Sequence, residues 1–194
     1  MSQSAASDTD RFLALLKPIE RDLERYCRRL IWEPQEAPDA LQNAVMKAFA
    51  AFERYSPEAS FRAWMFKILT HEAFALNRKH ARIARHEFQL EPEELEGLSP
   101  AGAPRDQAEH VSSFGGVTEN SEPELAAGLR TLTDTERAVL LLRGVGELRY
   151  QEIGESLGIP LGSVMGNLFR ARQKMRAFLG RSERRKSFLK ETGL

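Results

Sequence analysis

Apolar residues recur at helical spacing over most of the chain, and this pattern predicts three helices in the first half. In the first, residues 10–32, Leu16 and Leu23 share one side with further apolar residues while charged residues occupy the other. Pro18 interrupts the pattern, so we expect a kink or a break there. A second helix is predicted over residues 39–54 and a third over 61–86.

The pattern changes twice in the second half. From Glu87 to Glu122 the periodicity fails, and Pro, Gly, Ser and Glu dominate, which is the composition of a linker. Helical spacing resumes near Pro123, and the string TDTE (residues 133–136) has the spacing of a capping box at a helix start. No alternating pattern predicts a strand. The sequence therefore predicts an all-α fold of two small helical domains joined by a linker.

The stretch GIPLGSVMGNLFRARQKMR (residues 158–176) predicts a tight turn followed by a helix. Gly154, midway along the preceding helix, would let the second helix cross closely at that point. Gly158 tolerates the positive φ of the turn. Val164 begins an apolar stripe that faces that helix. This spacing favours a helix-turn-helix, whose second helix enters the major groove by its N-terminal residues. The alternative is an ordinary helical hairpin with a solvated basic face.

Charge is segregated along the chain, although Lys and Arg balance Asp and Glu at 28 each. Residues 87–128 hold ten acidic residues and one basic residue, Arg105, whereas residues 10–86 and 129–194 are both net basic. The local fields decide what each block attracts, so a neutral total does not argue against a nucleic-acid partner.

Other kinds of site find little support. With Cys27 as the one cysteine, an intramolecular disulfide is excluded and a cysteine-based zinc site is disfavoured. The four histidines have no partnered nucleophile. Nothing in the sequence marks a membrane span or an export signal. We expect a cytoplasmic protein that is not an enzyme, with no catalytic residues, no metal, no cofactor and no membrane contact.

Both halves resemble the extracytoplasmic-function (ECF) group of the sigma-70 family. The first half does so through DALQNAVMKAFAAFERYSPEASFRAWMFKILTHEAFALNRKHAR, and the second through LTDTERAVLLLRGVGELRYQEIGESLGIPLGSVMGNLFRARQKMR. The resemblance covers roughly residues 10–84 and 123–180. It implies a region 2-like domain at 1–86, an acidic flexible linker at 87–122, and a region 4-like helix-turn-helix domain with a basic tail at 123–194.

The resemblance implies a sigma factor that binds core RNA polymerase, reads the −35 duplex and opens the −10 element of a promoter. The partners implied are the β′ and β subunits and promoter DNA, and many members of the group also bind an anti-sigma factor. The residues matched to polymerase binding are Asp39, Gln42, Asn43 and Lys47. The residues matched to −10 DNA are Tyr55, Ser60, Phe61, Lys67, His71, Arg78 and Lys79. The residues matched to −35 DNA are Ser163, Met165, Asn167, Arg170, Arg172 and Lys174.

Some positions have a second interpretation. Asp39 and Gln42 also fit a solvated helix edge. Aromatic faces can hold unstacked bases, and we expect Phe61 to contact DNA and Trp64 to lie mostly in the core.

The acidic linker could occupy a channel built for nucleic acid, mask the basic blocks, or serve only as a solubilising tether.

The recognition helix departs from the family pattern, which has Ser-Arg where this chain has Gly166 and Asn167. Gly166 weakens the helix by up to about 1 kcal/mol relative to Ala, and Asn167 removes an expected DNA contact. Two other functions therefore stay open. One is a sigma-like protein that acts mainly by binding polymerase or a regulator, and the other is a stand-alone helix-turn-helix regulator.

Overall fold

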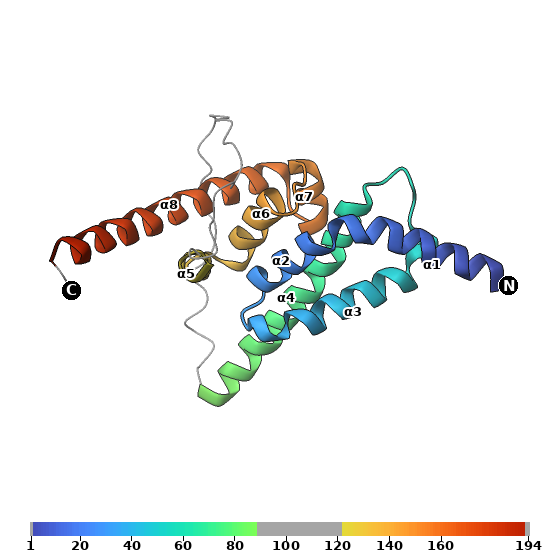
Figure 1. The fold of residues 1–194 in the computed structure, drawn as a ribbon, viewed down its shortest axis with the longest axis horizontal. Helices are drawn as coiled ribbons and strands as arrows, with labels where there is room; N and C mark the ends of the chain where they lie inside the picture. The colour runs from blue at the N-terminus through green and yellow to red at the C-terminus, as the bar shows by residue number, and fades with distance from the viewer. Residues whose placement is uncertain (1, 89–121, 193–194) are drawn as a thin grey trace.

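The computed structural model describes residues 2–88 and 122–192 of the 194-residue chain, with side chains described for 8–83 and 123–181 (Figure 1). All regular elements in these ranges are helical. The α-helices are α1 (Ser2–Leu16), α2 (Glu20–Leu30), α3 (Ala37–Ala50), α4 (Phe61–Phe88), α5 (Glu122–Arg130), α6 (Asp134–Gly144), α7 (Tyr150–Leu157) and α8 (Leu161–Thr192). The predicted all-α fold is confirmed, and most of the acidic linker lies outside the described residues.

Local sequence signals account for several helix ends. A 3-10 turn, Lys17–Ile19, carries Pro18 and separates α1 from α2, so the expected break is present. The Ser60 hydroxyl accepts a hydrogen bond from the backbone N–H of Ala63 (3.2 Å) at the start of α4. Before α6, Thr133 and Glu136 form the predicted capping box.

The N-terminal half, α1–α4, buries one side of α2 against α3 and α4. Tyr26 and Cys27 of α2 are fully buried, and the Tyr26 hydroxyl lies 2.6 Å from Oγ1 of Thr70 on α4. Because Thr70 also donates to the carbonyl of Phe66 (2.6 Å), both buried hydroxyls are satisfied. Alanines at every fourth position of α3 keep its inner side small, which lets the neighbouring helices approach closely: Ala40, Ala44 and Ala48.

The C-terminal half, α5–α8, packs around the apolar side of α8. Val164, Leu168, Ala171 and Met175 of the buried stripe expected on this helix are each at most 3% exposed, whereas Phe178, expected to continue the stripe, is only half-buried. The Met175 side chain lies against Gly128 of α5, where an added Cβ would be 2.9 Å from the Met175 methyl carbon. The region after Gly180, expected to be a basic tail, continues α8 as helix to Thr192 (Figure 1).

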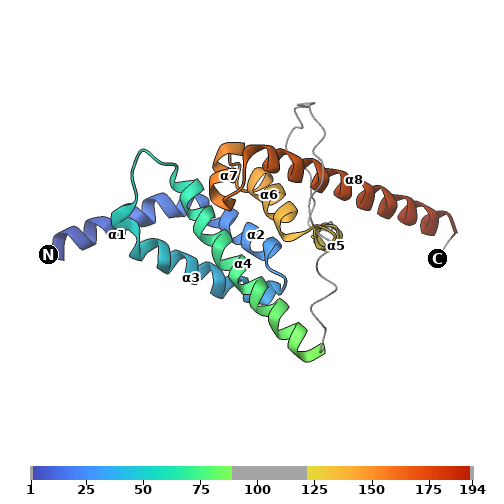
Figure 2. The ribbon, with the colours of Figure 1, turned by 180° about the vertical axis from the view of Figure 1, so that it is seen from behind.

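The two halves lie in contact with each other. Helix α2 packs against α6, and α4 packs against both α6 and α7, as both ribbon views show (Figures 1 and 2). The sequence predicted two domains on a tether and gave no indication of this contact. Arg170 and Arg172 are nevertheless not enclosed by it, because both keep part of their surface exposed.

Candidate nucleic-acid interface

The turn between α7 and α8 has the geometry of a helix-turn-helix. Gly158 ends α7 with φ 66° and ψ 32°, a left-handed conformation that favours glycine. The N–H of Ile159 donates to the carbonyl of Gly154 (3.0 Å), and a Cβ on Gly154 would lie 2.9 Å from the Ile159 carbonyl oxygen. The turn expected at Gly158 is therefore confirmed. The close approach at Gly154 is made by the turn itself, while the Val164 side chain of α8 would lie at an ordinary 3.6 Å from that Cβ.

The first turns of α8 present an outer face that is mainly apolar. Met165 is 49% exposed, and Leu161 and Phe169 lie one turn before and after it with comparable exposure. Ser163 is exposed as well, so the N-terminal end of the helix is open to a partner. The sequence assigned Met165 to DNA contact but did not identify Leu161 and Phe169, although their spacing of four residues from Met165 was a readable signal.

Three of the polar side chains expected to bind DNA from α8, those of Asn167, Arg170 and Lys174, already have partners within the domain. The Asn167 amide donates to the Ser163 carbonyl (2.8 Å) and accepts from Arg170 (3.0 Å). Lys174 Nζ lies 2.7 Å from the Glu136 carboxylate, and Arg170 Nε lies 3.5 Å from it. DNA contact by these residues stays a prediction, and it would compete with these bonds.

Glu136 is the centre of this ion cluster. Burial opposes its ionisation, but hydrogen bonds from Lys174 and from Thr133 outweigh burial and lower the pKa of the carboxyl. Only 4% of its side chain is exposed, so the charge is held where water cannot replace the two cations. The cluster therefore fixes α8 to the N-terminus of α6.

In the N-terminal half, the two aromatic residues expected at −10 DNA, Tyr55 and Phe61, form part of an aromatic cluster. The Phe61 ring lies 5.4 Å from the Tyr55 ring and 5.7 Å from the Trp64 ring, centroid to centroid. Phe61 is only 7% exposed, while Trp64 is partly exposed, so the expected order of burial is reversed. The reason is that Phe12 of α1 and Phe52 close over Phe61.

The basic residues expected on α4 have different surroundings. Lys67, Arg78 and Lys79 are exposed to solvent. His71 is exposed too, but its ring also hydrogen-bonds through Nε2 to the carbonyl of Ser156 on α7 (3.3 Å). The C-terminal half therefore lies against part of the surface expected to hold −10 DNA.

The residues expected at polymerase lie together on the outer edge of α3. Asp39, Gln42 and Asn43 are exposed, and Lys47 pairs with Glu72 of α4 (2.7 Å). Met46 lies on the same edge with 62% exposure and was not identified from the sequence. Its position one turn after Gln42 and Asn43 was the signal that could have indicated it.

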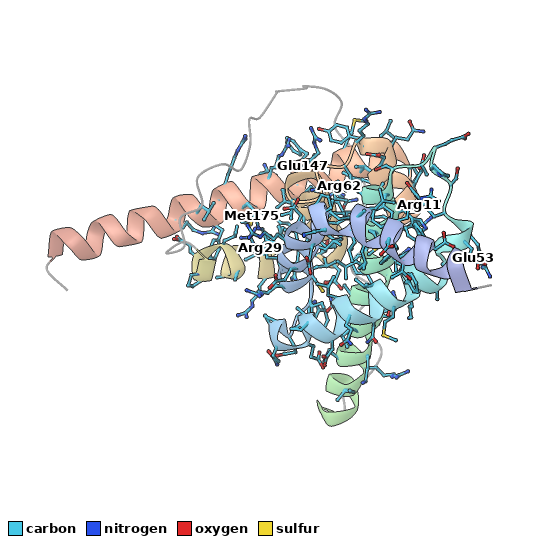
Figure 3. The ribbon with its side chains drawn as sticks, turned by 45° about the vertical axis from the view of Figure 1, so that its right-hand side comes forward. Arg11, Arg29, Glu53, Arg62, Glu147 and Met175 are labelled. Atoms are coloured by element: carbon cyan, nitrogen blue, oxygen red, sulfur yellow. The ribbon has the colours of Figure 1, made fainter. Side chains whose placement is uncertain are left out.

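Arg62 of α4 makes the closest polar contacts between the halves. Its guanidinium donates to the carbonyls of Gly146 (2.5 Å) and Val145 (2.9 Å) in the turn after α6, and also to Asp22 of α2 (2.7 Å). Figure 3 shows Arg62 beside the turn that carries Glu147. At the other end of α6, Trp32 Nε1 donates to Asp134 (3.0 Å). We call these contacts the junction.

In the part of the chain that the structure describes, no helix has the length and apolar character needed to cross a bilayer. No group of three or more His, Cys, Asp or Glu side chains in these ranges is placed to hold a metal ion.

This combination of a helix-turn-helix with a second helical domain defines a two-domain DNA-binding class of protein. Sequence comparison identifies the class more closely. Residues 15–83 match Sigma-70 region 2, and residues 124–175 match Sigma-70, region 4. The chain belongs to the sigma-70 family, in its ECF group.

Curated relatives agree with this placement. The chain is 28% identical over 157 residues to the ECF RNA polymerase sigma factor SigE of Mycolicibacterium smegmatis, covering 81% of this chain and 57% of the relative. It is 24% identical over 182 residues to SigW of Bacillus subtilis, covering 91% and 92%. The chain spans about half the length of the first relatives it matches, 57% of SigE and 47% of SigG of Mycobacterium tuberculosis.

Two solved structures share the fold. CnrH in complex with the cytosolic domain of CnrY has a TM-score of 0.61 at 21% identity, covering 92% of this chain and 94% of CnrH. RpoE of Bartonella quintana in complex with the anti-sigma factor NepR has a TM-score of 0.61 at 20% identity, covering 89% and 96%.

Proposed function

We propose that this chain is a promoter-specificity subunit of RNA polymerase, without catalytic activity of its own. It binds core polymerase through the outer edge of α3, reads −35 duplex with α8, and opens the −10 element with α4 and the loop before it. Family membership supports this function, and one observation carries it: the candidate surfaces on α3 and α8 are both exposed in one chain. Its place of action is the cytoplasm, where its proposed partner works.

The function requires the two halves to separate. Elements centred near −35 and −10 lie roughly 25 base pairs, or about 85 Å, apart along B-DNA. Helical domains of this size are about 30 Å across, so two domains in direct contact cannot reach both elements. The 33 residues between the described ranges can span at most about 110 Å when extended. We therefore propose that the junction opens when the protein engages polymerase and promoter.

A transcription assay with purified core polymerase tests the proposal. We expect initiation at a defined promoter only when the chain is added, and loss of this activity in an Asp39→Ala, Gln42→Ala double variant that still folds. Binding to duplex promoter DNA without any effect on polymerase would support a stand-alone regulator. Binding to polymerase without initiation would support a protein-interaction role, which the internal partners of Asn167 and Arg170 favour.

The same assay can examine regulation. The two similar solved structures are both complexes, with the cytosolic domain of CnrY and with the anti-sigma factor NepR. We propose an anti-sigma factor as a partner of this chain also, which a pull-down from the native cell using the full chain as bait would detect. A captured protein that abolishes initiation in the purified system would qualify, and one that leaves initiation unchanged would not.

A further inference from the structure

The outer face of α8 has an unusual composition for a helix expected to read DNA. Leu161 is 50% exposed, Met165 49% and Phe169 58%, and these are three of the eight large apolar residues that are exposed in the described parts of the chain. Their spacing of four residues places them along one side of the helix. None of the three side chains carries a hydrogen-bond donor. We call this set the apolar stripe.

Two glycines lie beside the apolar stripe without a packing reason inside the protein. A Cβ on Gly162 would meet nothing within 4 Å, and a Cβ on Gly166 would approach only the Arg170 guanidinium, at 3.5 Å. Each glycine weakens a helix by about 1 kcal/mol relative to Ala. Their presence therefore fits a partner that approaches the helix backbone closely, as the floor of a DNA groove does.

Charge around the apolar stripe favours a polyanion as that partner. Between Glu155 and Glu183 the sequence has no acidic residue and five basic ones: Arg170, Arg172, Lys174, Arg176 and Arg181. Arg172 and Arg176 follow Phe169 by three and seven residues, so they continue the same side of the helix. Arg149, at the N-terminus of α7, adds another exposed cation. A protein helix would have to be strongly acidic to suit these surroundings.

The first turns of α8 are poorly suited to recognising guanine. A guanidinium reads guanine through two hydrogen bonds, yet Arg170 is held by Asn167 and Glu136. The apolar group that the major groove offers is the C5-methyl of thymine. Leucine, methionine and phenylalanine side chains would bury these methyl groups, while Arg172 and Arg176 reach the phosphates beyond.

We infer that the apolar stripe reads thymine methyl groups, so that the −35 element of this protein is rich in A·T pairs. The inference rests on the proposed function. It assigns Leu161 and Phe169 to base reading together with Met165, and it assigns phosphate contact to Arg172 and Arg176.

Two steps test the inference: selection of the −35 sequences that the holoenzyme prefers, and removal of the methyl groups from the thymines of the selected sequence. Holoenzyme reconstituted from core polymerase and the full chain is used to select −35 sequences from a randomised promoter library. Each thymine of the selected element is then replaced by deoxyuridine, which removes only the methyl group. We expect an A·T-rich element and about fourfold weaker holoenzyme binding for each methyl that contacts the stripe, the equivalent of one buried methyl at about 0.8 kcal/mol.

Alanine variants show which side chains are responsible for the preference for methylated bases. Met165→Ala and Phe169→Ala, at exposed positions, should each bind the thymine and deoxyuridine elements with more nearly equal affinity. Leu13→Ala is the matched control, since Leu13 is also exposed (52%) but lies on α1; it should keep the full difference.

The other outcomes are distinct. A G·C-rich selected element, or no loss on methyl removal, would overturn the inference while leaving the proposed function intact. A methyl effect that Met165→Ala and Phe169→Ala leave unchanged would also overturn it, and would assign the stripe to a protein partner. If no library member supports initiation, both the proposed function and the inference fail.

Discussion

Arg62→Ala should shift the protein from the closed arrangement toward separated halves. Of the three acceptors of Arg62, Asp22 belongs to the same half, so Arg62 contributes to the junction through its bonds to the carbonyls of Val145 and Gly146. Hydrogen bonds that involve a charged group contribute about 1.5–3 kcal/mol each. With 23% of the Arg62 side chain exposed, water competes for it, and we take about 2 kcal/mol for the pair. The ratio of closed to open molecules should then fall about 30-fold.

Two measurements in solution check this expectation. Small-angle X-ray scattering should give a larger radius of gyration for Arg62→Ala than for the unsubstituted chain. In a Trp64→Phe background, Trp32 is the single tryptophan, and its emission should shift to the red as its bond to Asp134 across the junction is lost. Far-UV circular dichroism should stay the same, because each half keeps its own core.

Arg25→Ala provides the matched control. Arg25 also lies near Asp22 (4.0 Å), but it is 54% exposed and on the same helix. This variant should stay compact. Equal compactness of Arg62→Ala and Arg25→Ala would show that the two carbonyl contacts do not contribute to the closed arrangement.

Three further predictions concern the stability and reactivity of the protein. Glu136→Gln should lower the free energy of unfolding by about 1–2 kcal/mol at pH 7. Because the pKa of Glu136 is lower in the folded protein, this difference in stability should be complete above about pH 4.3 and should vanish as the pH falls through the folded pKa. Urea titrations at several pH values measure it. Gly154→Ala should cost about 2 kcal/mol through its 2.9 Å contact with the Ile159 carbonyl, whereas thermal melting should find Gly162→Ala as stable as the unsubstituted chain or more so. Burial raises the pKa of Cys27 to about 12, so iodoacetamide at pH 8 should label it about 10³-fold more slowly in the native protein than in denaturant, and equal rates would contradict this burial.

Features set by neighbouring residues could be predicted from the sequence. The capping box at Thr133 and Glu136 and the left-handed Gly158 depend on contacts within a few positions of the chain, and both are present. The break at Pro18 follows from one residue's missing N–H and fixed φ. The helical fold and the helix-turn-helix follow from signals of this kind.

Contacts between distant segments could not be predicted in this way. In the sequence Arg62 is an ordinary charged position in a helix, and its two acceptors in the other half lie more than 80 residues further along. The pairing of Glu136 with Lys174 likewise spans 38 residues. The burial of Phe61 depends on Phe12 arriving from α1, which periodicity within the third predicted helix cannot show. Each outcome depends on how whole helices pack.

The hydrogen bonds of Arg137 offer little resistance to separation of the two halves. Its guanidinium donates to Leu129 and Leu132 in its own half and, at 3.5 Å, to Leu30 in the other, and Leu30 keeps Asn77 as a second donor (3.2 Å). Separation of the halves therefore leaves neither the Arg137 guanidinium nor the Leu30 carbonyl buried without a hydrogen-bond partner. Resistance to separation also comes from the packing of α2 and α4 against α6 and α7, within a hydrophobic cluster that includes residues of both halves, and hydrophobic attraction weakens on cooling. Chilled samples should thus contain a larger share of extended molecules than warm ones.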